Sequence, residues 1–345
     1  MTAITLTEGS QATRPKVVFV FSTRGAQWGG MLRELYETSP VFREVIAQCD
    51  REIKQHLDWS LEEKITRESE SDWLDSEECI EPAIASLQLA LVALWRSYGV
   101  YPDAVLSMSA GEYAAACCAG AMTIEGVIRA VCAISLMIRR RLGLGAMISV
   151  KADLEEVERV RHLIPVPFWV TAQIGPGTLI LATEATDAET LISSLADSGI
   201  QCIRIPSDFA FHAPQMDDWE PEFLRGPQYF CARPAQLPIY SAVVGGLLDP
   251  AAFTTDVHYW HVLRIPALYA GAVRRSLEDG YEIYLEIGPH PILSDSIEAS
   301  AALLGKQVAV LPSLRCDQPA QEVMEQTLIT LRSLGYLPAR RTPLA

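Results

Sequence analysis

Ser109 stands in a short turn between two segments of opposite character, and this arrangement limits how the chain can fold. Ala104–Leu106 is short and apolar and predicts a buried strand, whereas Glu112–Ala121 is rich in alanine and predicts a helix. Ser109 occupies the turn between them, with the small residues Ser107 and Gly111 two positions away on either side. A turn this tight requires small flanking residues, so the pattern predicts a nucleophile elbow. An ordinary strand-to-helix turn is the alternative.

The composition indicates a folded protein with an acidic surface. Of the 345 residues, 49% are hydrophobic and 21% are charged, and 28 Lys and Arg against 43 Asp and Glu give a formal net charge of −15. These values exclude a disordered chain. A surface of this charge repels phosphate groups, so we expect neither nucleic acid nor an anionic membrane among the partners.

Signals for targeting and for metal binding are weak. No apolar stretch reaches the roughly 20 residues of a membrane-spanning helix without interruption, and residues 1–15 are predicted to be a disordered lead-in. The eight cysteines include no CxxC pair, so we expect neither a zinc site nor another metal site. We therefore expect reduced thiols and a cytoplasmic location.

The pattern of residues 146–206 predicts a small, separate subdomain. Its elements follow the order β-α-β-β-α-β of a ferredoxin-like subdomain. The six predicted elements are Ala146–Val150, Asp153–His162, Phe168–Ala172, Thr178–Ala182, Ala188–Asp197 and Gln201–Ile205. We predict that this unit is inserted into a larger α/β domain made of residues 16–145 and 207–312. Residues 313–345 are predicted to be a C-terminal tail with one helix near Ala320–Leu334.

A serine hydroxyl needs a general base to act as a nucleophile, and histidine is the usual base at neutral pH. The six histidines are His56, His162, His212, His258, His261 and His290. His212 comes where the inserted unit returns the chain to the large domain, and His290 lies in a turn after a predicted strand. Position alone ranks these two only slightly ahead of the others.

Seven motifs are spaced along the chain from about Lys16 to the C-terminus. They are Gly25-Ala26-Gln27-Trp28, Ser109-Ala110-Gly111-Glu112-Tyr113, Gly145-Ala146-Met147, Phe209-Ala210-Phe211-His212-Ala213-Pro214-Gln215-Met216-Asp217, Tyr259-Trp260, Leu285-Glu286-Ile287-Gly288-Pro289-His290-Pro291 and Leu311-Pro312-Ser313-Leu314-Arg315. In this order they resemble the acyltransferase domains of polyketide synthases and the malonyl-CoA:acyl carrier protein transacylases. The resemblance implies an α/β-hydrolase-like large subdomain with an inserted ferredoxin-like small subdomain.

The same resemblance assigns roles to individual residues. Ser109 would be the nucleophile and His212 its general base, and the backbone N–H groups of Ala110 and Arg24 would hold the oxyanion. His290 falls in a structural turn. The resemblance further implies a free-standing enzyme without a bound cofactor, whose thioester substrates carry the phosphopantetheine of coenzyme A or of an acyl carrier protein.

The chain departs from this family around the nucleophile. Met108 replaces the histidine that usually precedes the serine, which changes the pocket wall without removing the base. The family's Gly-Gln-Gly loop reads Thr23-Arg24-Gly25, so a cation stands beside the site or, alternatively, points to solvent.

In the family a backbone carbonyl from a Trp-x-x-Asn-Leu stretch orients the base. Here the stretch reads Trp260-His261-Val262-Leu263, and we expect the carbonyl of His261 or Val262 to replace it.

Further departures concern the substrate. Ile134 falls where extender-selecting members carry an Arg that pairs with the carboxylate of malonyl groups, and a buried carboxylate without a counter-charge is costly. Ile174 stands where the family commonly has the Asn of an Asn-Gly-Pro turn. Glu81 would disfavour anionic acyl groups and favour an amine, unless it lies on the surface. Phe211 resembles the malonyl-type signature and leaves no room for an α-methyl branch. These pocket residues predict an enzyme that rejects dicarboxylic acyl groups.

The leading interpretation is an acyltransferase that moves a monocarboxylic starter or intermediate acyl group to an acyl carrier protein through a Ser109 ester. A hydrolase of acyl carrier protein thioesters is the first alternative, and a non-catalytic carrier-binding scaffold is the second. Because carrier proteins are usually acidic, docking requires a local cationic surface. The candidates are the run Arg139, Arg140 and Arg141 and the pair Arg274 and Arg275, with solvated helix faces as the alternative. We expect a monomer.

Overall fold

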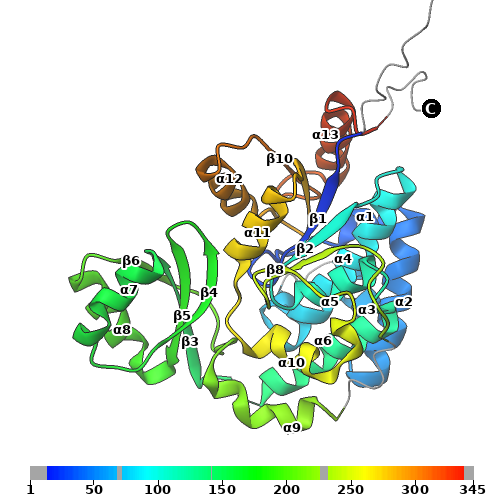
Figure 1. The fold of residues 1–345 in the computed structure, drawn as a ribbon. Helices are drawn as coiled ribbons and strands as arrows, with labels where there is room; N and C mark the ends of the chain where they lie inside the picture. The colour runs from blue at the N-terminus through cyan, green and yellow to red at the C-terminus, as the bar shows by residue number, and fades with distance from the viewer. Residues whose placement is uncertain (1–13, 68–71, 141, 226–231, 338–345) are drawn as a thin grey trace, which may run out of the picture.

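The computed structural model describes residues 14–67, 72–140, 142–225 and 232–337. These residues form two parts, each built on a β-sheet of its own (Figure 1). The amide of Gly143 donates a hydrogen bond to the carbonyl of Asp208 at 2.9 Å. The chain therefore enters and leaves the smaller part at adjacent points, as an inserted unit must.

The larger part is built on a six-stranded sheet. In spatial order its strands are β10 (Ala309–Pro312), β9 (Ile283–Ile287), β1 (Val17–Phe21), β2 (Ala104–Ser107), β7 (Ile239–Ser241) and β8 (Gly246–Leu247). The first five are parallel, and β8 pairs with β7 in the antiparallel direction at the edge. Every residue of β1, β2 and β9 is buried, which explains why these segments are almost continuously apolar in sequence.

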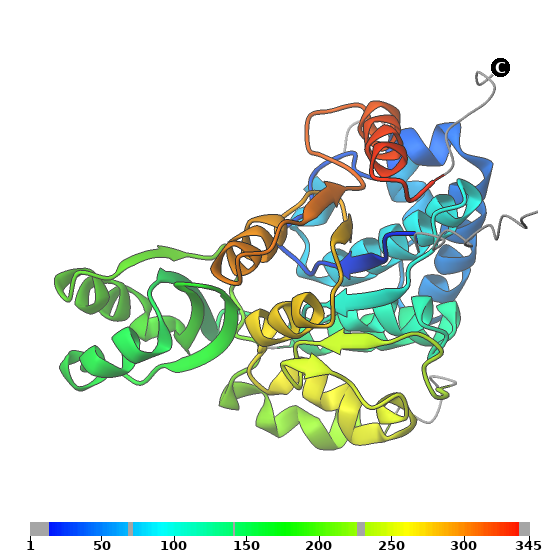
Figure 2. The same cartoon turned by 45° about the horizontal axis from the view of Figure 1, so that its top comes forward.

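Helices cover both faces of this sheet (Figure 2). The helices of the larger part are α1 (Arg33–Thr38), α2 (Pro40–His56), α3 (Leu61–Thr66), α4 (Glu77–Ser97), α5 (Gly111–Cys118), α6 (Ile124–Arg139), α9 (Glu220–Phe223), α10 (Asp256–Arg264), α11 (Tyr269–Glu278), α12 (Ser294–Leu303) and α13 (Ala320–Ser333). Alternate residues of β1 point to opposite faces, Phe19 into the core with α2, α4, α5 and α6, and Val20 into the core with α11 and α12. The sheet is thus the middle of three layers.

Helix α4 is long and apolar enough to cross a membrane by length and composition alone. It has 21 residues, and its most apolar window has a mean hydropathy of 1.4, although Glu81 and Pro82 interrupt the apolar run in the sequence. Of this window, 89% is buried inside the protein. A core helix of a folded domain meets the same criteria, so α4 is weak evidence for a membrane span.

The smaller part is a four-stranded antiparallel sheet with helices α7 (Leu154–Val160) and α8 (Ala188–Asp197) packed around an apolar core of its own. In spatial order the strands are β4 (Trp169–Gly175), β5 (Thr178–Glu184), β3 (Gly145–Lys151) and β6 (Gln201–Arg204). The strand that comes first in this part lies between the third and the fourth, which is the ferredoxin-like order. The predicted fold class is therefore confirmed.

Main-chain hydrogen bonds attach the edge strand of the smaller part to the larger part. The amide of Gln173 on β4 donates to the carbonyl of Ala267 at 2.8 Å, and the amide of Ala267 donates to the carbonyl of Thr171 at 2.8 Å. Ala267 lies just before α11 of the larger part. This pairing places β4 beside the carboxyl ends of the parallel strands.

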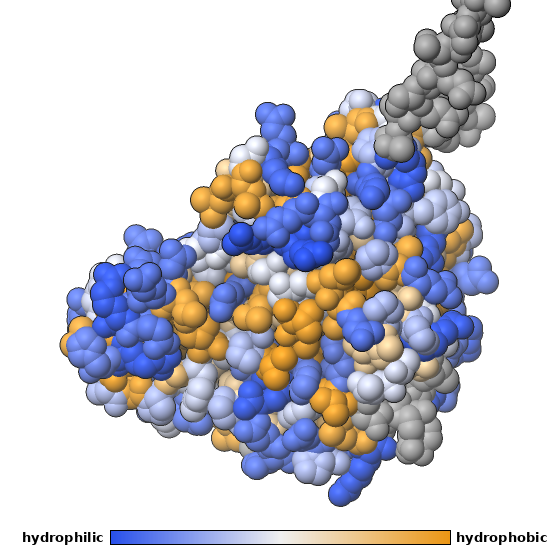
Figure 3. Space-filling view, in the orientation of Figure 1, coloured by the Kyte–Doolittle hydropathy of each residue, from blue (hydrophilic) through white to orange (hydrophobic). Residues whose placement is uncertain are grey.

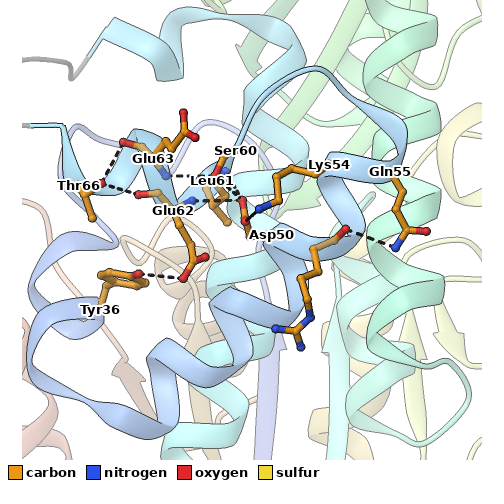
Figure 4. A network of polar contacts seen from close by, with 10 residues as sticks. Tyr36, Asp50, Lys54, Gln55, Ser60, Leu61, Glu62, Glu63 and Thr66 are labelled. Carbon is orange, nitrogen blue, oxygen red and sulfur yellow. Dashed lines mark hydrogen bonds and ion pairs between the residues drawn. The ribbon is translucent and has the colours of Figure 1, made fainter.

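A buried aspartate fixes the start of the short helix α3 (Figure 4). Asp50, on α2, accepts hydrogen bonds from Ser60 Oγ at 2.8 Å and from the Leu61 amide at 2.7 Å, and it pairs with Lys54 Nζ at 2.8 Å. Burial raises the pKa of the Asp50 carboxyl, but the hydrogen bonds outweigh burial and the pKa lies below its usual value. The ionised carboxylate thereby caps α3 and ties it to α2.

The two ends of the described chain pack onto the larger part. Thr327 Oγ1, on α13, donates to the carbonyl of Pro312 at 2.9 Å. The buried apolar side chains of α13 include Val323, Met324, Leu328 and Leu331. The predicted C-terminal tail therefore contains a core helix. At the other end, Arg14 pairs with Asp103 at 2.8 Å, whereas residues 1–13 of the predicted lead-in lie outside the described residues.

The hydrophilic surface expected from the composition is interrupted on one face. In Figure 3 hydrophobic surface forms a band across the middle of the molecule, in the region of β8 and α10, and hydrophilic surface covers much of the smaller part. The exposed apolar side chains near these two elements are Val244, Leu247 and Val257.

Candidate active site

Ser109 stands at a sharp turn between β2 and α5. Its φ is +51°, in the left-handed region that residues with a side chain rarely adopt. A Cβ atom on Gly111 would lie 2.4 Å from the carbonyl oxygen of Ser22 and 2.7 Å from that of Phe21. The turn therefore packs directly on the end of the neighbouring strand β1, and only glycine fits two residues after the serine.

His212 lies directly against this serine. Ser109 Oγ and His212 Nε2 are 2.8 Å apart, and His212 Nδ1 is 2.8 Å from the carbonyl oxygen of Ile265. Because a carbonyl oxygen only accepts hydrogen bonds, Nδ1 of the neutral ring carries the proton and Nε2 accepts the serine hydroxyl. The amide of His212 also donates to the carbonyl of Leu263 at 3.0 Å, so the main chain fixes both the ring and its backbone.

The carbonyl that orients the base belongs to Ile265, which corrects the expectation of His261 or Val262. Those two residues lie inside α10, and the carbonyl of His261 already accepts the amide of Ile265 at 3.3 Å. Ile265 is the first residue after the helix, and its carbonyl points to the imidazole instead of continuing the helix.

Burial sets the protonation state of His212. His212 is 4% exposed, and burial lowers its pKa to about 4. The hydrogen bond to Ile265 opposes this shift, and the nearby Arg264 adds to it. The imidazole is therefore neutral at pH 7 and free to accept a proton.

The two predicted oxyanion donors lie on adjacent loops. Strands β1 and β2 are parallel, with Phe21 opposite Ser107, so the loop with Arg24 and the turn with Ala110 leave the sheet side by side. Ala110 precedes α5, and the helix does not use its amide. Their role as donors stays a prediction.

An apolar cavity of about 210 Å³ adjoins Ser109 and His212. Four of the five predicted pocket residues line it, namely Glu81, Met108, Ile174 and Phe211, and so does Arg24, a predicted oxyanion donor. Apolar side chains make up most of the remaining wall, and they are Met147, Ala172, Ile180, Ile205, Ile292 and Leu293. Because β3, β4 and β5 supply several of these residues, the cavity lies between the two parts of the molecule.

Ile134 does not line this cavity, which corrects its predicted place in the pocket. It is fully buried on α6, within the core of the larger part. The side chain of isoleucine is much shorter than that of arginine, so it ends inside the core. The position still supplies no cation to the cavity.

The side chain of Arg24 turns into the protein instead of pointing to solvent. It is 15% exposed, it pairs closely with Glu77, and its Nε is 3.5 Å from Glu81 Oε1. Its guanidinium carbon lies 5.2 Å from the centre of the Phe211 ring. Glu81 itself is only 3% exposed, so this acid belongs to the cavity wall and not to the surface.

A buried polar cluster behind the serine turn escaped the sequence analysis. Glu112 is fully buried, and its carboxylate accepts hydrogen bonds from Ser107 Oγ at 3.0 Å and Ser241 Oγ at 2.6 Å and contacts His258 Nε2 at 2.8 Å. These contacts tie together β2, α5, β7 and α10. The available signal was a glutamate in an alanine-rich helix that has to pack against a sheet.

The predicted carrier-protein surface is partly neutralised. Arg139 pairs with Glu78 at 3.0 Å, and Arg140 pairs with Glu222 at 2.5 Å. Both arginine side chains are more than half exposed. Arg141 lies outside the described residues.

A comparison with protein families identifies the chain. The family model described as the acyl transferase domain matches residues 18–336. The chain belongs to this family. The resemblance that the seven motifs indicate is thereby confirmed.

Curated relatives of this acyltransferase domain are polyketide synthases. It is 37% identical over 304 residues to the spectinabilin polyketide synthase system protein NorA of Streptomyces orinoci. It is 35% identical over 311 residues to the polyketide synthase GfsA of Streptomyces halstedii. These matches cover 88% and 87% of this chain but 16% and 4% of the relatives. The chain thus spans only a small part of the length of these relatives.

Solved structures agree with this assignment. A loading acyltransferase from the avermectin modular polyketide synthase superposes on this acyltransferase domain with a TM-score of 0.84 and 30% identity, covering 92% of this chain and 99% of the other. The acyltransferase domain from module 8 of the salinomycin polyketide synthase gives a TM-score of 0.86 and 26% identity, covering 93% and 75%.

Proposed function

We propose that this acyltransferase moves a non-dicarboxylic acyl group, a starter or an intermediate, to an acyl carrier protein through an ester on Ser109. The donor is a thioester of coenzyme A or of another carrier protein. One observation carries the proposal: Ser109 Oγ lies 2.8 Å from His212 Nε2 beside an apolar cavity. Because the relatives are polyketide synthases, they support a place for this enzyme in polyketide-type biosynthesis.

The first step loads the serine. Nε2 of the neutral His212 takes the hydroxyl proton of Ser109, and Oγ attacks the carbonyl carbon of the thioester. The N–H groups of Ala110 and Arg24 stabilise the resulting oxyanion. The carbon–sulfur bond then breaks, His212 gives the proton to the departing thiolate, and the acyl group remains on Ser109 as an ester.

The second step reverses the first with another thiol. The phosphopantetheine thiol of the acyl carrier protein gives its proton to His212, and its sulfur attacks the ester carbon. The bond between this carbon and Ser109 Oγ breaks, and the serine regains its proton from His212. The phosphopantetheine arrives with each substrate, so this scheme needs no cofactor bound to the enzyme.

The lining of the cavity supports the exclusion of dicarboxylic groups. Among its described lining residues Arg24 is the one cation, and Glu77 already pairs with it closely. Glu81 contributes a carboxylate to the same wall. A second carboxylate on the acyl group would therefore be buried without a counter-charge of its own, at a cost of several kcal/mol.

We propose that the phosphopantetheine arm approaches His212 through a second cavity of about 540 Å³. This cavity also has His212 in its wall, and it runs between β4 of the smaller part and the segment before α11. Arg264 and the ion pair of Arg161 with Glu158 line it together with apolar side chains. Guanidinium groups suit the phosphate of the arm, and the apolar surface suits its carbon chain.

We further propose that Arg139 and Arg140 contribute to docking of the carrier protein. Because each is exposed and already paired with an acid, reversing both charges should weaken transfer to the carrier only about threefold. The double variant Arg139→Glu, Arg140→Glu should load from coenzyme A thioesters at the normal rate. An equal loss in loading and in transfer would contradict this role.

The decisive experiment is to incubate the protein with an equimolar mixture of malonyl, acetyl, medium-chain, aromatic and aminoacyl thioesters. Intact mass is then measured beside a Ser109→Ala variant. We expect an adduct from a non-dicarboxylic acyl group that is absent in the variant. A malonyl adduct would contradict the predicted selectivity, and the absence of any adduct would favour a non-catalytic scaffold.

The decay of the adduct separates transfer from hydrolysis. An acyltransferase should hold the ester until a carrier protein is added and should then pass the acyl group to its phosphopantetheine thiol. Rapid loss of the adduct to water, with no acylated carrier, would instead identify a thioester hydrolase.

A further inference from the structure

Two charged side chains, Arg24 and Glu81, line the apolar cavity, and a third, Glu77, lines a neighbouring one. Together they bring two carboxyl groups and one guanidinium. The guanidinium of Arg24 pairs closely with Glu77 through Nη2, and its Nε lies 3.5 Å from Glu81 Oε1. Two carboxylates thus share one guanidinium, and all three side chains are less than one-fifth exposed. An unmatched charge in such a place is unfavourable unless another group compensates it.

The two carboxylates are not equivalent. Glu77 has the close contact with Arg24, and it lines a neighbouring cavity of about 630 Å³ instead of the one beside Ser109. Glu81 lines the cavity beside Ser109, and its side chain is 4% exposed. At 3.5 Å its contact with Arg24 is longer than a normal charge-assisted hydrogen bond. Glu81 is therefore the acceptor that the acyl group meets.

Arg24, in contrast, is not available to bind an anionic acyl group. Two of its nitrogens face the carboxylates, and its third, Nη1, is buried from solvent without a hydrogen-bond partner among the described residues. The guanidinium also lies 5.2 Å from the centre of the Phe211 ring. The charged group that the cavity offers to an acyl group is therefore the Glu81 carboxyl.

We propose that Glu81 selects acyl groups that carry a protonated amine on the chain beyond the thioester carbonyl. The ammonium would bring the missing positive charge and the hydrogen-bond donors that the carboxylate lacks. Burial raises the pKa of Glu81, the Arg24 charge lowers it, and the Glu77 charge raises it again, which agrees with an under-compensated carboxyl. This inference rests on the proposed loading of Ser109, and it names the substrate class for that site.

The test compares three acyl groups of nearly equal size: 3-aminobutyryl, 3-hydroxybutyryl and 3-methylbutyryl thioesters of coenzyme A. Loading of Ser109 is followed by rapid quench and intact mass. We expect the amino compound to load at least tenfold faster than the methyl compound, with the hydroxyl compound between them. Glu81→Gln should reduce the ratio of the amino rate to the methyl rate at least fivefold.

Glu78→Gln is the matched control, because Glu78 lies on the same helix but pairs with Arg139 at the surface. It should leave the ratio unchanged. Equal loading of the amino and methyl compounds by the natural protein would overturn the inference, whether or not Glu81→Gln folds. An unchanged ratio in folded Glu81→Gln would overturn it too. If no thioester loads Ser109, the proposed function fails first, and this result is distinct from loading without preference.

Discussion

The two ends of the cavity are built in different ways. At the catalytic end the main chain holds the reacting groups: Ser109 and His212 both have a φ between +50° and +60°, and the carbonyl of Ile265 fixes the imidazole. At the recognition end side chains hold one another, since Arg24 pairs with Glu77 and Glu81.

This difference explains which departures from the family the chain tolerates. A backbone N–H or carbonyl survives the replacement of its side chain, so Met108 and Arg24 can differ from the family while the serine and the histidine stay in contact. A recognition contact made by side chains is lost when one of those side chains is replaced. We infer that the chemistry is kept by backbone geometry and that the selectivity changes with single residues.

The largest effect should come from removing the base. His212→Ala should slow loading of Ser109 about a thousandfold, because the serine loses its proton acceptor. The measurement is single-turnover loading from an acyl-CoA. The exposed His162→Ala serves as a control and should load normally. Loading by His212→Ala within tenfold of the natural rate would show that another group acts as the base.

The next largest effect should be a loss of folding stability when the buried cluster around Glu112 is disrupted. Glu112→Ala leaves His258, Ser107 and Ser241 without their shared acceptor, and a buried polar group left without its hydrogen bond costs about 1–3 kcal/mol. Thermal and urea unfolding measure this loss, with the exposed Glu44→Ala as the control. Equal stability of the two variants would mean that the cluster does not support the turn.

The pH dependence of loading tests the burial of the base. Only neutral His212 accepts the serine proton, and its pKa of about 4 keeps it neutral as the pH falls from 7 to 5. We therefore expect a nearly constant rate over this range and a decline as the pH falls through 4. With the ordinary pKa of 6.5, only about 3% of the imidazole would be neutral at pH 5. A steep loss of rate between pH 7 and pH 5 would contradict the buried, neutral base.

The smallest effect should come from restoring the family's histidine before the nucleophile. Met108 is an apolar side chain of the cavity wall, so Met108→His should change the loading rate only about threefold through the shape of the pocket. The shape of the pH profile should stay that of His212. A new decline near pH 6.5 would show that the introduced histidine takes part as a base, and the contrast between the two ends would then be wrong.

Much of the fold could be predicted from short stretches of sequence. The apolar runs of β1 and β2, the small residues around Ser109 and the β-α-β-β-α-β order of the smaller part each lie within a few tens of residues. Periodicity and the steric limits of a tight turn act over these distances. The candidate pair Ser109 and His212 came from the resemblance, since position alone hardly separated His212 from His290.

Only the tertiary structure decided those features of the site that depend on contacts between residues far apart in the sequence. The serine and its histidine are 103 residues apart, and Glu112 and His258 are 146 residues apart. Local pattern does not show that the carbonyl of Ile265 contacts His212, that Arg24 turns inward to Glu81, or that Ile134 ends in the core and not in the cavity. The sequence by itself determined the fold and the elbow, because backbone sterics and apolar burial are local. Packing decided the chemistry of the pocket wall, because side-chain partners are chosen only once the layers are assembled.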